Sequence, residues 1–204
     1  ERYDQTAKQH YDHRYKSIQH EKYKVMLDGL AALISSALLD APVNIQDIRD
    51  EGEIMLDLGC GTGLFADFFY GKYLARGAYI GIDLSVQMLY VAKSRIIHHN
   101  GHLVLGSIDS LPIRSGCSSS VASFSAFQNL DDVQKLQFLD EIARVLKLHH
   151  PVFLFSFLDK PPLTDNLPVL TKKLSLHFHH VEKIDTSEDK EDVLLACYNT
   201  RNVI

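Results

Sequence analysis

The stretch MLDLGCGTG, residues 55–63, places three glycines at alternate positions directly after an apolar run. Residues 54–58 alternate like a buried strand with Asp57 near its end, and the glycines permit a sharp turn into the following helix. A second acid, Asp83, ends the next predicted strand, where a carboxylate can accept two hydrogen bonds from a ribose diol. These residues predict a platform on which a ribose-containing ligand approaches the backbone closely.

Two phosphate-binding motifs do not fit this turn. The dinucleotide fingerprint G-x-G-x-x-G requires a third glycine where this sequence has Leu64. A P-loop requires Gly-Lys-Ser or Gly-Lys-Thr to hold a phosphate and its magnesium ion, and neither follows the turn. The ligand is therefore expected to carry a ribose without needing a pyrophosphate cradle.

The elements that must position these acids alternate between strand and helix, which is typical of a parallel, doubly wound sheet. Strands are predicted at 53–58, 78–83, 102–107, 120–127 and 151–158, and the last is apolar on both faces and therefore central. Helices are predicted at 4–39, 65–74, 84–99, 130–147 and 169–176, with Ser85 and Asp131 as N-caps. Residues 178–185 and 193–199 predict a C-terminal antiparallel hairpin on the sheet edge.

The whole pattern predicts an α/β fold with a doubly wound, mostly parallel, seven-stranded sheet. The C-terminal hairpin completes this sheet, and a helical N-terminal arm precedes it. With 46% hydrophobic residues, the 204-residue chain can bury one full-sized core. We therefore expect a single domain, 1–204, made of the arm (1–50) and the core (51–204).

Composition narrows the classes of partner and the compartment. A net charge of −5 argues against a surface that binds nucleic acid non-specifically. The three cysteines show no C-x-x-C spacing, and no apolar run approaches the roughly 18 residues of a membrane span. The chain is expected to be cytoplasmic, without a membrane partner.

At this point the residues resemble a known family. LDLGCGTG followed by GIDLS is similar to the first two motifs of class I S-adenosylmethionine-dependent methyltransferases, whose fold is Rossmann-like. The similarity extends to SLPI (110–113), to EIARVLK (141–147), and to the N-terminal YDQTAKQHYDHRY, which resembles a segment that closes over the cofactor in small-molecule members. The resemblance implies S-adenosylmethionine as cofactor and methyl transfer as the activity.

The resemblance also implies a role for each matching residue at the amino-acid end of the cofactor. Gly59 and Gly61 would let that end lie against the backbone, and Cys60 would contribute main chain. Asp57 would lie under its ammonium side. Tyr11 would cover the sulfonium region from the N-terminal arm.

At the nucleoside end, the resemblance implies that Asp83 holds the ribose hydroxyls. Leu84 and Met88 would flank the adenine on one side. Ile108 would contribute its backbone amide and an apolar face on the other, and Ser107 occupies the preceding position in the adenine site.

Three positions depart from the family pattern. Ser107 stands where the family often has an aspartate that caps the adenine amino group, and Asp109 is a candidate substitute. Ser118–Ser119 replaces a Phe-Asp pair, and His149–His150 replaces a Gly-Gly pair. Histidine tolerates the left-handed backbone better than most residues, so the second turn can survive.

The reaction needs alignment of acceptor, methyl and sulfur more than a dedicated base. If the acceptor must lose a proton, the candidates are His13 and Tyr11, with Asn129 as an orienting group, and no catalytic residue is assigned. Methylases of the exocyclic amines of bases carry an N/D-P-P-Y/F signature after the fourth strand, where this chain reads SAFQN. Adenine methylation is therefore disfavoured.

The acceptor stays open between classes. A short chain without a large insertion favours a small molecule, whereas Arg14, Lys16 and Lys22 could line a docking face for RNA or protein. A non-catalytic binding module with the same fold is the alternative from another class. His177 and His179 invite a metal interpretation, but a solvated edge strand is favoured and no metal site is predicted.

Overall fold

The computed structural model describes residues 11–37, 53–73, 77–96, 101–147, 151–158, 167–184 and 192–199. Helix α2 (Tyr11–Ala37) precedes the strands β1 (Ile54–Leu58), β2 (Ala78–Asp83), β3 (Gly101–Leu105), β4 (Ser120–Phe124), β5 (Val152–Leu158), β6 (His180–Ile184) and β7 (Asp192–Tyr198). Between the strands lie α3 (Leu64–Tyr73), α4 (Val86–Ile96), the short 3-10 helix η2 (Phe127–Asn129), α5 (Asp132–Val145) and α6 (Leu167–Leu174).

The seven strands form one sheet in the order β3-β2-β1-β4-β5-β7-β6. The first five strands pair in parallel, whereas β7 pairs antiparallel with both β5 and β6. The predicted doubly wound sheet and C-terminal hairpin are therefore confirmed. Because the strand order reverses between β1 and β4, a crevice is expected outside the carboxyl ends of these two strands.

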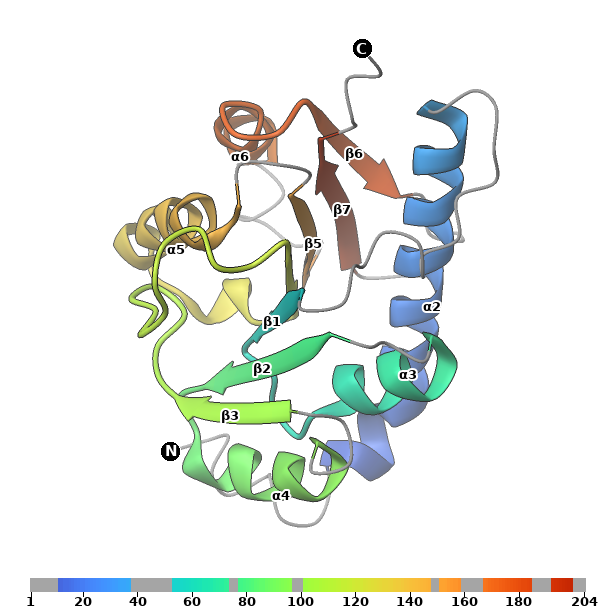
Figure 1. Ribbon diagram of the computed structural model, residues 1–204, viewed down its shortest axis with the longest axis vertical. Coiled ribbons are helices and arrows are strands. Elements are labelled where there is room, and N and C mark those ends of the chain that lie inside the picture. The colour runs from blue at the N-terminus through green and yellow to red at the C-terminus, as the bar shows by residue number, and fades with distance from the viewer. Residues whose placement is uncertain are drawn as a thin grey trace.

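Helices cover both faces of this sheet (Figure 1). On one face, α2 and α3 pack on inward side chains such as Met55 and Tyr79. On the other, α5 and α6 cover Leu56, Leu58 and a series of phenylalanines from β5. Successive side chains of a strand point to opposite faces, so Asp57 shares the α2 face with Met55.

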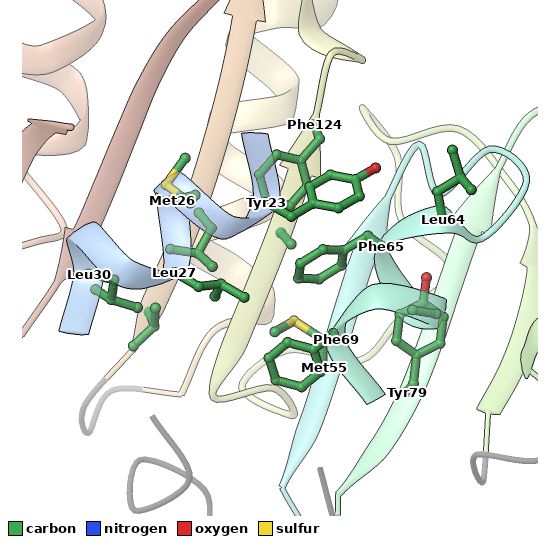
Figure 2. Close-up of a cluster of buried hydrophobic side chains, with 14 of the residues drawn as sticks. Tyr23, Met26, Leu27, Leu30, Met55, Leu64, Phe65, Phe69, Tyr79 and Phe124 are labelled. Atoms are coloured by element: carbon green, nitrogen blue, oxygen red, sulfur yellow. The ribbon is translucent and has the colours of Figure 1, made fainter. Parts of the chain in front are cut away.

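Helix α2 presents an almost continuous buried stripe to the sheet, at spacings of three and four residues. Gln19, Lys22, Tyr23, Met26, Leu27 and Leu30 are all buried. Figure 2 shows Tyr23 against Phe124, with Phe65 beside them. Met26, Leu27 and Leu30 follow further along the helix. The ring centroids of Tyr23 and Phe124 are 4.8 Å apart, and those of Tyr23 and Phe65 are 5.2 Å apart. Helix α2 is thus part of the core.

Two predicted caps are confirmed, whereas several predicted strands, among them the third, fourth and sixth, extend past the observed ones. The Asp131 side chain accepts from the N–H of Gln134, and the Gln134 side chain accepts from the N–H of Asp131, which together form a capping box. The Ser85 hydroxyl accepts from the N–H of Met88 at 3.3 Å. The fourth strand was expected to reach residue 127, but β4 ends at Phe124 because Ser125 has a φ of 57°. The chain then enters η2.

The histidine-rich segment also differs from expectation. His177 lies in a turn before β6 rather than on a strand, and both His177 and His179 are exposed. Over the parts of the chain that the structure describes, no three His, Cys, Asp or Glu side chains come together as a metal site would require. Among these same residues, no helix is both long enough and apolar enough to cross a membrane.

Candidate functional site

Three N–H groups of the glycine turn donate hydrogen bonds to other parts of the protein. The N–H groups of Gly59 and Cys60 both donate to the carbonyl of Ile82, at 2.8 and 3.0 Å. The N–H of Gly61 donates to Oδ2 of Asp83 at 2.8 Å. The turn that follows β1 is therefore tied to the carboxyl end of β2.

The first two glycines of the turn both have left-handed φ angles, but their surroundings differ. Gly59 has a φ of +74°, and a Cβ added there would lie 2.5 Å from the Cβ of Ala126. Gly61 has a φ of +53°, and a Cβ added there would meet nothing within 4 Å. Gly59 thus makes room for the segment after β4, whereas Gly61 faces open space that a ligand can use.

Alanine substitutions test this difference. We expect Gly61→Ala to lower the free energy of unfolding by about 1–2 kcal/mol, the cost of a left-handed alanine. Gly59→Ala adds an overpacking cost of about 1–3 kcal/mol. In urea titrations, Ala126→Gly should rescue part of the Gly59→Ala loss and none of the Gly61→Ala loss. Equal losses for the two alanine variants would contradict this assignment.

Asp83 holds the carboxyl end of β2 against the glycine turn. Its Oδ2 accepts from Gly61 and its Oδ1 accepts from the N–H of Ser85 at 2.8 Å. A carboxylate offers about four acceptor positions, so it can accept from several donors at once. The carboxylate is half-buried and oriented by the backbone. It fits the role of a preset acceptor for a ribose diol.

Asp57 is buried beside the turn, with 2% of its surface exposed. Burial raises the pKa of this carboxyl to about 7, because the charged form loses its hydration. The Tyr79 hydroxyl, also fully buried, donates a hydrogen bond to Oδ2 of Asp57 and opposes part of this rise. An acid in this state is readily converted to a carboxylate by a nearby cation.

The raised pKa of Asp57 predicts a pH-dependent stability. Between its ordinary value of 3.8 and about 7, the folded chain holds a proton that the unfolded chain releases. The free energy of unfolding therefore falls as pH rises through this window, by up to about 1.4 kcal/mol per pH unit from this group. Relative to wild type, Asp57→Asn should gain about 2 kcal/mol between pH 5 and 7 and nothing more above pH 8. A difference that stays constant with pH in urea titrations would contradict the buried acid.

The residues expected around the adenine lie beyond Asp83. Leu84 is exposed and Met88 is buried, so Leu84 offers the freer apolar surface. Ile108 is buried in the core on the α5 side of the sheet. The Ser107 hydroxyl donates to the carboxylate of Asp109, which sets this acid beside the position where the family often has aspartate.

A small cavity of about 30 Å³ lies between the glycine turn and α2. Its lining residues come from α2, from the glycine turn with the start of α3, and from the sheet: Gln19, Tyr23, Asp57, Gly59, Cys60, Gly61, Thr62, Leu64, Phe65 and Phe124. Cys60 is a buried thiol whose pKa is raised by burial, so it packs as a small neutral side chain. Tyr11 begins α2, but its side chain lies outside the described part of the structure, as do those of His13 and Arg14.

The first turns of α2 are fastened to this site by polar contacts. Asp12 accepts from the Thr62 hydroxyl at 2.6 Å and from the guanidinium of Arg95 on α4. Arg95 also donates to the carbonyl of Thr62. The arm, the glycine turn and α4 thus meet at one point, which holds α2 over the cavity.

A buried cation lies next to the end of β4. Lys22 forms an ion pair with Asp192 at 2.7 Å and donates to the hydroxyl of Ser125 at 2.8 Å. The N–H of Ser125 donates to the carbonyl of Ser156 on β5 at 3.1 Å. These contacts hold Ser125 in its left-handed conformation, a kind of strain that clusters at functional sites.

Sequence reasoning missed several residues that the structure brings to the cavity. The family resemblance gave no role to Gln19, Thr62 or Phe124, yet all three line the cavity. Gln19 could have been found from its spacing, because it lies four residues before Tyr23 and so falls on the same face of a helix. His149–His150 lies outside the described residues.

Comparisons with known proteins agree with this geometry. A family model described as a methyltransferase domain matches residues 55–149. The probable 18S rRNA (guanine-N(7))-methyltransferase of Dictyostelium discoideum is 36% identical over 88 residues, which are 42% of this chain and 28% of that protein. The malonyl-[acyl-carrier protein] O-methyltransferase of Halalkalibacterium halodurans is 31% identical over 111 residues, 52% of this chain and 38% of that protein.

One solved structure is similar over almost the whole chain. The complex between the Haloferax volcanii Trm112 methyltransferase activator and a putative methyltransferase contains a chain with a TM-score of 0.64 and 18% identity, covering 98% of both chains. At this identity the similarity concerns the fold. This chain spans only 27% to 54% of the lengths of the curated relatives it matches.

Proposed function

We propose that this chain, which matches a methyltransferase domain model over residues 55–149, is a class I S-adenosylmethionine-dependent methyltransferase that transfers a methyl group to a small-molecule acceptor. Bound S-adenosylmethionine supplies a methyl group on a positively charged sulfur, ready for displacement. The observation that carries the proposal is the pairing of Asp83 with the glycine turn, because the N–H groups of Gly61 and Ser85 orient this carboxylate at the carboxyl end of β2, beside the turn.

The residues of the chain fit the cofactor in three ways. Asp83 would hold the ribose hydroxyls, with Leu84, Met88, Ser107 and Ile108 around the adenine. Open space over Gly61 leaves room for the amino-acid end.

The glycine turn would contribute its backbone shape to the site, and the acid before it, Asp57, would contribute its carboxyl group. Gly59 and Cys60 would provide the turn itself, because their N–H groups already donate to Ile82. Asp57 would lie under the ammonium, and Tyr11 would cover the sulfonium from α2. The chain aligns and shields the reacting atoms in this proposal, and no base is assigned.

A small molecule remains the favoured acceptor because little of the described chain is left to build a wide groove. Of the basic residues considered for a docking face, Lys22 is buried and paired with Asp192, so it cannot bind an external polyanion. Lys16 is exposed, although it lies 3.5 Å from Asp67. The three cysteines are free and buried, which agrees with the proposed cytoplasmic location.

An RNA acceptor is the second candidate, favoured by one specific observation. Two named 18S rRNA (guanine-N(7))-methyltransferases, from Bos taurus and Mus musculus, are 34% and 37% identical to this chain over 90 and 84 residues. These matches cover 30% and 27% of those proteins, less than a third of each. The related fold in a Trm112 complex makes a Trm112-type activator the partner to include in any assay of RNA methylation.

The acceptor can be found by incubating the chain with methyl-labelled S-adenosylmethionine and fractions of a cell extract. We expect label in the small-molecule fraction, and none when Asp83→Ala replaces the wild-type chain. Label in the RNA fraction, alone or only with a Trm112-type activator, would replace the small-molecule proposal by the second candidate. Label in no fraction despite cofactor binding would favour a non-catalytic module.

A further inference from the structure

Gln19 is a buried polar side chain on an otherwise apolar stripe. It lies on α2, four residues before Tyr23, with only 7% of its surface exposed. Both residues line the cavity at the glycine turn, together with Asp57 and Gly61. Its side chain therefore belongs to the wall of the proposed cofactor site rather than to the solvent face of the helix.

The buried amide oxygen of Gln19 is an unsatisfied hydrogen-bond acceptor among the described residues. Among the described residues, none donates a hydrogen bond to Oε1 of Gln19, although that atom is buried. A buried acceptor without a donor costs free energy relative to the same atom in water. Such an exception in a cavity wall points to a donor that arrives from outside the chain.

The chemistry of the cavity indicates which donor this is. The N–H groups of Gly59, Cys60 and Gly61 are already used by Ile82 and Asp83, so the turn offers few donors to an anion. The nearby cation Lys22 is occupied by Asp192 and Ser125. Asp57 and Gln19 line the same small cavity and each carries an acceptor oxygen. An ammonium with three N–H donors is the complement of two such acceptors.

We propose that Oε1 of Gln19 accepts a hydrogen bond from the ammonium group of bound S-adenosylmethionine, opposite Asp57. This inference rests on the proposed function and adds a binding residue from α2, outside every motif that carries the family resemblance. The acidic residue below the turn and the helix above it would then hold the same group from two sides. The raised pKa of Asp57 agrees with this site, because an ammonium would return that acid to its charged form.

Three ligands separate the ammonium contact from the rest of the cofactor. S-adenosylhomocysteine carries the full amino-acid end. 5′-Deoxy-5′-(3-aminopropylthio)adenosine keeps the amine and lacks the carboxylate, and 5′-methylthioadenosine lacks both. In the wild-type chain, calorimetry should find the amine ligand to bind about tenfold more tightly than 5′-methylthioadenosine, as a charge-assisted hydrogen bond predicts.

The variant Gln19→Met keeps the size of the side chain and removes the acceptor. In this variant we expect the tenfold preference to fall to about twofold, with 5′-methylthioadenosine bound as in wild type. Gln128→Met is the matched control, since Gln128 also has a buried amide oxygen without a donor among the described residues but does not line the cavity. The control should keep the wild-type preference.

Each result decides between the two proposals. A preference for the amine that persists in Gln19→Met, or an equal loss of all three ligands, would overturn the role of Gln19. A wild-type chain without any preference for the amine would overturn it as well, and this readout does not depend on how the variant folds. A wild-type chain that binds none of the ligands would overturn the proposed function itself, and this inference with it.

Discussion

The Asp83→Ala variant is expected to bind S-adenosylhomocysteine at least about 100-fold more weakly than wild type, because two charge-assisted hydrogen bonds to the ribose are lost. Part of this loss arises within the protein. Without the carboxylate, the N–H groups of Gly61 and Ser85 lose their acceptor, and the turn is no longer held against β2. Calorimetric titration measures the combined effect.

A second ligand separates ribose recognition from distortion of the turn. Wild type should bind 5′-methylthioadenosine more tightly than its 2′-deoxy analogue, whereas Asp83→Ala should bind both equally. Asp140→Ala, which removes an exposed acid from α5, should behave as wild type throughout. If Asp83→Ala still distinguished the two ligands, another group would have to hold the ribose.

Replacing Lys22 with methionine is expected to cause the largest loss of stability, about 3–5 kcal/mol in the free energy of unfolding. The side chains of Lys22 and Asp192 are 6% and 14% exposed, so removal of the cation leaves a carboxylate in a largely dry site. The hydroxyl of Ser125 loses its donor at the same time. Urea unfolding provides the measurement.

The same helix supplies the control for this prediction. Lys24 pairs with Asp28 at 2.8 Å, but the two side chains are 60% and 50% exposed. Lys24→Met should therefore cost no more than about 0.5 kcal/mol. The double variant Lys22→Met/Asp192→Leu should be more stable than Lys22→Met alone, because no unpaired charge remains buried. A double variant that lost the sum of both single losses would show that packing, and not the charge, stabilises this site.

The sheet was predictable because its signals are local. The apolar runs of β1 and β5, the acid at the end of β2 and the cap at Asp131 each determine their element within a few residues. The end of β4 was not predictable, because the conformation of Ser125 depends on Lys22 and Ser156, which are distant in sequence. Strain imposed by tertiary contacts leaves no local pattern.

The same distinction applies to the candidate site. The glycine turn and Asp83 were predicted to work together, and the hydrogen bond between Gly61 and Asp83 confirms that they meet. Gln19 was missed because a glutamine on a helix is usually solvated, and Lys22 was assigned to a docking face for the same reason. Both side chains are instead buried by the way α2 crosses the sheet.

The central claim is that the glycine turn, Asp83 and α2 enclose S-adenosylmethionine. Its most direct test is to follow the backbone amide resonances of the wild-type chain during titration with S-adenosylhomocysteine. We predict saturation below about 1 mM ligand, with the largest shifts at residues 59–63 and 83–85 and around Gln19. Unchanged resonances at that concentration, or shifts confined to another face of the sheet, would contradict the account.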